Sequence, residues 1–232
     1  MPDLAWLEDL FTTKRRLDAD ANATPERARQ LAGFKAWQSA RLARTYEDLR
    51  RDPRCKAAVE FFLSDLYGPQ SFARRDADFE RAWDRLKRGL PERALEALGH
   101  ALELQVLSAR LDQAMVGWLA GTALNEISYA NAYRAVGRAD ARQRQIDLVV
   151  NIGSDLARLV EFPLIGLALR AAHLPAHLAG FGALQDFLEK GFSAFRHLQD
   201  ARVLLEAIRT RETALMHALF SGSDDPFHLE TR

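Results

Sequence analysis

Apolar residues recur three and four positions apart along nearly the whole sequence, a spacing that places them on one side of an α-helix. One clear stripe has members at i, i+3, i+4 and i+7: Val59, Phe62, Leu63 and Leu66. Alternation with a period of two, which a half-buried strand needs, is nearly absent. Ala, Leu, Arg and Glu are abundant and favour helices. We therefore predict an all-α protein, a compact multi-helix bundle of about 8–10 helices with no sheet.

Proline, glycine and capping residues divide this pattern into helices. Thr24 stands before Pro25 and predicts a helix start, as does Asp52 before Pro53. Gly68 then predicts the end of the helix that Asp52 caps. The segment from about residue 91 to about residue 120 carries two apolar stripes, so we expect this helix at the centre of the bundle.

The second half of the chain is divided in the same way. Pro175 predicts a helix break, and the last helical segment is expected to divide near Asp200. No fixed-period repeat or long linker is present, which indicates a single domain. We predict one helical domain over residues 1–220 and a C-terminal tail over residues 221–232.

The charge balance restricts the partners of the protein. Lys and Arg together number 32, as do Asp and Glu, so the formal net charge is zero and a general nucleic-acid binder is not expected. The segment Lys14–Lys56 is more basic, with twelve basic and six acidic residues. Two interpretations stay open: this segment docks on a more acidic body, or it contacts an acidic membrane surface.

The single cysteine, Cys55, fits a reducing compartment, and the N-terminus lacks the features of a signal peptide. The longest uncharged run is Ala171–Gln185, shorter than the roughly 20 residues that a membrane-spanning helix needs. We therefore expect a cytoplasmic protein with no transmembrane segment. Cys55 lies beside Arg54 and Lys56, which favour a lowered thiol pKa, although an incidental thiol is the simpler interpretation.

Motifs that carry chemistry are nearly absent. The sequence has no phosphate-binding loop, no nucleophile elbow and no Glu-x-x-His pair of the kind that binds di-iron centres. His173 and His177 have the spacing of helical metal ligands, but Pro175 is predicted to break that helix. We predict no catalytic residue, no metal site and no cofactor.

The polar groups with most potential for binding surround the segment 60–76. Glu60 and Tyr67 fall on one side of the predicted helix, and Phe61 lies off its apolar stripe. Arg74, Arg75 and Asp76 follow at the start of the next helix. The two arginines could hold a phosphate or carboxylate there, or could pair with neighbouring acids and lock the turn.

Glu103 and Asp112 lie on the helix with two apolar stripes and are expected inside the bundle. A buried acid must be paired or protonated, and Arg134, Arg142 and Arg144 are candidate partners. Such a network is usually structural, and an internal catalytic carboxylate is the alternative.

The string Phe61-Phe62-Leu63-Ser64-Asp65-Leu66-Tyr67-Gly68 resembles the signature of an uncharacterised proteobacterial family known by its FFLEELY motif. Ser64 and Asp65 stand where the motif has two glutamates. The resemblance identifies relatives and implies no activity, so no functional residue is transferred.

We predict a non-catalytic binding or protein-interaction protein. The apolar stretch 162–188 is richer than a surface helix needs, and together with Phe61 it suggests a self-association face or a pocket for an apolar or anionic small molecule. The alternative is a helical-bundle enzyme that uses an internal carboxylate or an anion site at Arg74 and Arg75.

Overall fold

A computed structural model of the chain describes residues 4–66, 73–89, 92–198 and 200–228. These residues form eleven α-helices and one π-helix and contain no strand, which confirms the all-α prediction. The first half contains α1 (Leu4–Ala21), α2 (Pro25–Thr45), α3 (Glu47–Arg51), α4 (Lys56–Phe61), the π-helix η1 (Phe62–Leu66) and α5 (Ala73–Gly89). The second half contains α6 (Glu92–Leu119), α7 (Glu126–Val136), α8 (Ala139–Leu159), α9 (Pro163–Leu178), α10 (Gly182–Arg196) and α11 (Ala201–Ser221).

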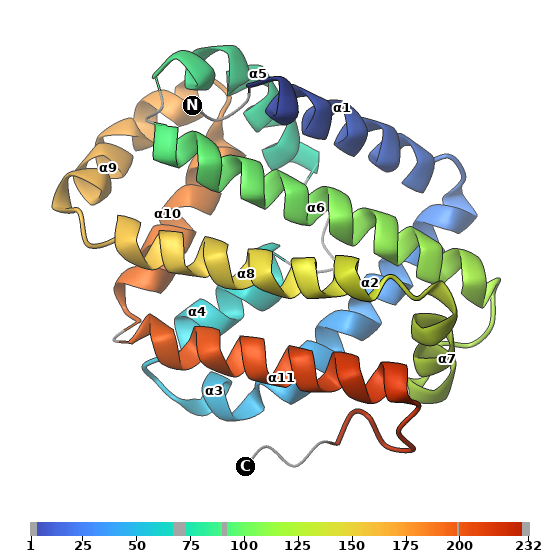
Figure 1. The fold of residues 1–232 in the computed structure, drawn as a ribbon. Coiled ribbons are helices and arrows are strands. Elements are labelled where there is room, and N and C mark those ends of the chain that lie inside the picture. Colours follow the sequence, from blue (N-terminus) through green and yellow to red (C-terminus); the bar gives the residue numbers. More distant parts are fainter. Residues whose placement is uncertain (1–3, 67–72, 90–91, 199, 229–232) are drawn as a thin grey trace.

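Four long helices lie side by side in the order α1, α6, α8 and α11, and α2, α4 and α10 cross behind them (Figure 1). The helix predicted to be central, α6, contacts α1, α2, α7 and α8. It buries residues of both predicted stripes, among them Leu102, Val106, Leu111 and Met115. None of the described helices has the length and hydrophobicity that crossing a membrane requires.

Local signals set several helix ends as predicted. The hydroxyl of Thr24 accepts a hydrogen bond from the Arg27 amide, and the carboxylate of Asp200 accepts one from the Arg202 amide. Gly222 closes α11 with a φ of 76°, a conformation that costs glycine little. Beyond it, the ring of Phe227 packs against Trp37 with ring centroids 5.9 Å apart. The division into a domain at 1–220 and a tail stays a prediction.

Two predicted boundaries were wrong. The helix expected to start at Pro53 begins at Lys56, because the Asp52 carboxylate binds the amide and guanidinium of Arg54 in a separate turn. The break expected at Pro175 does not occur, and α9 continues to Leu178. Pro175 has no N–H and therefore cannot donate a hydrogen bond to the carbonyl of Ala171. Because Ala171 is exposed, its carbonyl is not left unpaired inside the protein.

Candidate functional site

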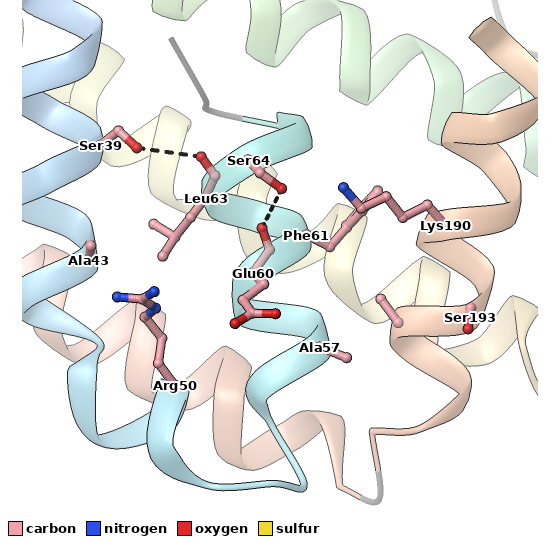
Figure 2. A pocket seen from close by; sticks show the side chains of 11 residues that line it. Ser39, Ala43, Arg50, Ala57, Glu60, Phe61, Leu63, Ser64, Lys190 and Ser193 are labelled. Carbon is pink, nitrogen blue, oxygen red and sulfur yellow. Dashed lines mark hydrogen bonds between the residues drawn. The ribbon is translucent and has the colours of Figure 1, made fainter. Parts of the chain in front are cut away.

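An open groove of about 760 Å³ lies between α2, α4 and α10, with Arg50 of α3 on its rim (Figure 2). Its apolar wall consists of small side chains and two larger ones: Ala43, Ala57, Phe61, Leu63 and Ala194. Its polar lining residues are Ser39, Arg50, Glu60, Ser64, Lys190 and Ser193. The groove therefore combines apolar surface with charged and hydroxyl groups.

The π-helix η1 forms one side of this groove and lies within the segment 61–68 that resembles the FFLEELY motif. The Ser64 hydroxyl donates to the Glu60 carbonyl at 2.7 Å, and the Ser39 hydroxyl of α2 donates to the Leu63 carbonyl at 3.5 Å (Figure 2). Short π-helical turns are frequent at functional sites because they re-aim side chains within a helix. The local widening supports the groove as the candidate site.

The charges around the groove are unequally paired. Lys190 binds Asp65 at 2.5 Å, and Lys56 lies 4.0 Å from Glu60 across one helical turn. No acidic group of the described residues lies within ion-pairing distance of the exposed Arg50 guanidinium. An anion that binds this guanidinium would therefore displace no acidic side chain of the described residues.

Glu60 and Phe61 have different surroundings although they are neighbours in sequence. Glu60 is exposed and points to the groove (Figure 2). Phe61 is only 2% exposed, and its ring packs against Phe187 at 5.4 Å between centroids. A Cβ at Gly191 would lie 2.8 Å from the Phe61 ring, so this glycine lets α10 approach α4. Phe61 therefore belongs to the core and is not an exposed self-association residue.

Arg75 and Asp76 form internal contacts at the start of α5. The buried Arg75 guanidinium donates to the Asp76 carboxylate and, at 3.0 Å, to the carbonyl of Asp65. It also lies 4.6 Å over the ring of Phe187. Asp76 accepts a further bond from Lys14 at 3.2 Å. For Arg75, these contacts match the alternative in which an arginine pairs with a neighbouring acid and locks the turn.

Two of the predicted site residues cannot be placed in this way. Tyr67 lies outside the described residues. Arg74 is part of α5, but its side chain lies outside the described part of the chain. The anion site predicted at the two arginines therefore stays a prediction.

Glu103 and Asp112 lie on α6 but do not share a site. Both oxygens of Glu103 accept hydrogen bonds from the Arg144 guanidinium of α8, at 2.8 and 2.7 Å. This contact is one of the pairings that the sequence suggested. Asp112 is 2% exposed. Neither of the two carboxylates lines the groove.

Cys55 is buried and lacks the surroundings of a reactive thiol. The residue is 4% exposed and packs in the cluster of α3, α4, α8 and α11. Burial, the largest effect, raises the pKa of the thiol, and Asp52 raises it further against the opposing effect of Arg54. The alternative of a lowered thiol pKa is therefore wrong, because the cationic neighbours point to solvent, whereas the sulfur lies inside.

A buried polar cluster between α2 and α11 was not evident from the sequence. Arg41 donates to both oxygens of Glu212, at 2.7 and 2.9 Å, and the Tyr46 hydroxyl donates to the same carboxylate at 3.0 Å. Burial and the Glu212 charge raise the pKa of Tyr46 well above its usual value. The cluster is closed to the groove, so we interpret it as a structural connection.

The outer side of α9 is a second exposed feature. Four leucines on this side are exposed, by 56% to 80% of their surface: Leu164, Leu167, Leu174 and Leu178. The sequence indicated an apolar surplus in this region but did not show which side of the helix meets solvent. The available signal was the spacing of 3, 4, 3 and 4 residues in the series Leu164, Leu167, Ala171, Leu174 and Leu178.

The fold and these two features define a class of protein: an all-helical bundle with an open groove and an exposed apolar helix. Within this class, a family model described as a domain of unknown function (DUF8198) matches residues 17–226. Because the match covers most of the chain, the protein belongs to this family. Neither the curated proteins nor the solved structures contain a match to the chain.

Proposed function

We propose that the protein is a non-catalytic interaction protein that self-associates through the outer face of α9. The observation that carries the proposal is the position of the exposed leucines. With Ala171 they form a stripe of five exposed residues spaced 3, 4, 3 and 4 apart: Leu164, Leu167, Ala171, Leu174 and Leu178. This is the a/d spacing by which one helix packs against another.

The attachment of α9 leaves this stripe uncovered. α9 packs on α10 and has no other extensive contact within the described residues. Its inner side approaches α10 closely, since a Cβ at Gly166 would lie 2.8 Å from the Phe192 ring. The stripe of five lies on the opposite side. Contiguous exposed apolar surface of this kind usually marks an interaction site.

A second copy of the chain is the partner that fits this stripe. A twofold interface places the same patch of both copies in contact, so the patch must be complementary to itself. All five residues of the stripe are uncharged, and the positions that flank them at 168, 170, 175 and 177 carry one permanent charge, Arg170. Pairing of two such helices therefore buries leucine against leucine with little repulsion. A membrane-surface helix, in contrast, is usually rich in Lys and Arg on its polar side.

Sedimentation velocity over a concentration series tests the proposal. A contact limited to one helix is small, near the lower limit of about 1,200 Å² for specific interfaces, so we expect a reversible monomer–dimer equilibrium. The double variant Leu167→Glu/Leu174→Glu should be monomeric with unchanged helix content by circular dichroism. The control variant Ile127→Glu/Val203→Glu adds the same charges at exposed apolar residues of α7 and α11 and should still dimerise.

A wild-type chain that stays monomeric at every concentration, or a stripe variant that dimerises like the control, would refute the proposal. Vesicle binding by a monomeric wild-type protein, lost in the stripe variant, would assign the stripe to a membrane surface instead.

The groove supports a second function, binding of a small amphipathic anion. The specific observation in its favour is Arg50, which has no ion-pair partner among the described residues and lies beside apolar lining residues. We also propose that residues 61–68 are the form that the FFLEELY motif takes in this chain, and Phe61, Leu63 and Ser64 of this segment line the groove. Native mass spectrometry should detect extra mass that Arg50→Gln removes. A bare protein under gentle conditions would contradict this second function.

A further inference from the structure

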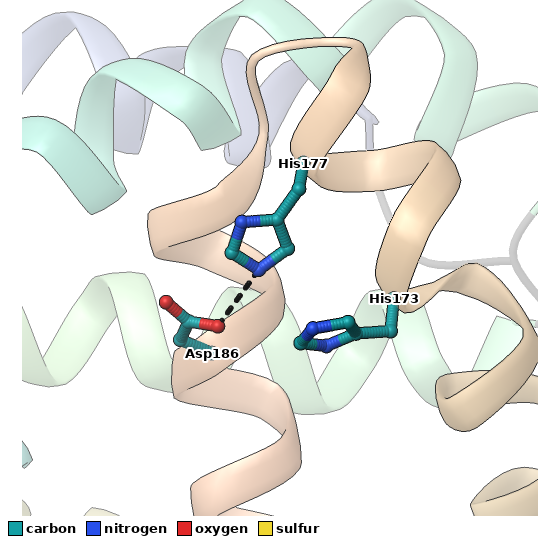
Figure 3. Close-up of side chains that lie close together, drawn as sticks. All are labelled: His173, His177 and Asp186. Carbon is teal, nitrogen blue, oxygen red and sulfur yellow. Dashed lines mark hydrogen bonds and ion pairs between the residues drawn. The ribbon is translucent and has the colours of Figure 1, made fainter.

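Two histidines and one aspartate converge on the solvent side of the α9–α10 pair. His173 and His177 are one turn apart on α9, and Asp186 faces them from α10 (Figure 3). The Nε2 atom of His177 lies 2.9 Å from Oδ1 of Asp186, and the centroids of the two imidazole rings lie 4.6 Å apart. One potential ligand atom from each of the three residues lies within 4.8 Å of the other two. Because α9 continues through Pro175, both rings project toward the same aspartate.

A fourth residue fixes one of these rings from behind. The two oxygens of Glu189 both lie 3.0 Å from Nδ1 of His173. Glu189 is itself held by the amide of Gln185, which is 5% exposed and donates to Glu189 at 2.8 Å and to the Leu169 carbonyl at 2.7 Å. A carboxylate on Nδ1 favours the tautomer that has its proton there, which leaves Nε2 of His173 as the electron-pair donor. The same carboxylate–histidine arrangement orients histidine ligands in many metal sites.

We propose that His173, His177 and Asp186 form a binding site for a divalent transition metal of the zinc type, with Glu189 as a positioning residue. Two imidazoles and one carboxylate are a typical ligand set for Zn²⁺, whereas Ca²⁺ and Mg²⁺ prefer oxygen ligands alone. Asp186 and Glu189 supply two negative charges that balance the charge of the ion. The site is exposed, so solvent completes the coordination.

The distances require only a small adjustment. Ligand bonds of about 2.0–2.2 Å at tetrahedral angles separate two ligand atoms by roughly 3.3–3.5 Å. The 2.9 Å contact between His177 and Asp186 is a hydrogen bond, so metal binding replaces its proton and moves the two groups slightly apart. Both side chains are partly exposed and can make this movement. The alternative is that the histidines form only two ion pairs, to Glu189 and Asp186.

Titration of the untagged chain with ZnCl₂ against a competing chelator distinguishes these alternatives. We expect one Zn²⁺ per chain and loss of that site in His173→Ala, His177→Ala and Asp186→Asn. Glu189→Gln should weaken binding by about 10–100-fold without abolishing it, as outer partners of metal ligands do. His217→Ala removes an exposed histidine on α11 and should bind like wild type.

Substitution with Co²⁺ provides a spectroscopic test, because Co²⁺ in a low-symmetry site with two nitrogen ligands absorbs visible light more strongly, and at longer wavelength, than octahedral aqueous Co²⁺. Circular dichroism checks that each variant is folded. No binding by the wild-type chain would overturn the proposal. Equal affinity in His177→Ala and wild type, or equal losses in His217→Ala and His177→Ala, would also overturn it.

Discussion

The side chain of Arg211 joins α11 to the end of α2 and the start of α3. Its guanidinium donates to the Thr45 carbonyl at 2.7 Å and to the two oxygens of Asp48 at 2.7 and 2.6 Å. The hydrogen bond from Arg211 is the largest effect on Asp48 and lowers the pKa of this carboxyl from its usual value of 3.8. A folded-state pKa below the unfolded value means that the ionised carboxylate stabilises the fold.

We predict that Asp48→Asn lowers the free energy of unfolding by up to about 1 kcal/mol at neutral pH, since the Asp48 side chain is 58% exposed and water screens its charge. The contribution of Asp48 is complete above pH 3.8 and is lost as the pH falls through its lowered folded-state pKa. The difference between the variant and the wild type should therefore shrink below pH 3.8. Urea unfolding at several pH values measures this difference in the free energy of unfolding. A difference that grows in acid would contradict a stabilising ion pair between Asp48 and Arg211.

At the scale of helices, glycines decide how closely two elements approach. Gly153 of α8 is buried, and a Cβ there would lie 2.4 Å from Cδ2 of Leu205 on α11. These two helices form one of the most extensive contacts of the bundle. Gly117 of α6 differs, because a Cβ there would meet nothing within 4 Å.

We predict opposite effects of alanine at these two positions. Gly153→Ala should destabilise the protein by about 1–3 kcal/mol, because the added methyl forces α8 and α11 apart. Gly117→Ala should stabilise it by about 0.5–1 kcal/mol, because alanine restricts the unfolded helix segment more than glycine does. Urea denaturation measures both. Equal effects of the two substitutions on the free energy of unfolding would show that the close contact at Gly153 does not limit how closely α8 and α11 approach.

The sequence predicted those features of the helices that depend on neighbouring residues. The cap at Thr24, the division at Asp200 and the length of α6 follow from side chains within a few positions of each boundary. It did not predict the course of α9 through Pro175 or the π-helix at Phe62–Leu66. Both depend on how the element packs against others, which local propensity does not contain.

The candidate sites were partly predictable for the same reason. Glu60 and Phe61 were singled out and do line the groove, but only the packing of Phe61 against α10 shows that its ring is buried. The apolar surplus of 162–188 was visible in sequence, whereas the exposed side of α9 is defined by the contact with α10. The metal-ligand spacing of His173 and His177 was visible too, but Asp186 joins them only through the tertiary fold.

At the scale of the whole molecule, the formal net charge is zero, so no long-range repulsion keeps two copies apart. The body of the bundle encloses its core between two layers of helices (Figure 1). Against this body, α9 is a peripheral helix with an apolar outer face. The proposed function therefore depends most on the pairing of α9 of one copy with α9 of another.

A distance measurement between spin labels at position 171 is the sharpest test of this α9–α9 pairing. Ala171 is the middle residue of the exposed stripe, so Ala171→Cys places a label on each copy near the twofold axis. The wild-type chain, treated with the same reagent, controls for labelling of the buried Cys55. We predict one short inter-label distance that disappears when Leu167→Glu/Leu174→Glu is added. Absence of that distance at concentrations where the protein is dimeric would contradict the claim and place the interface elsewhere.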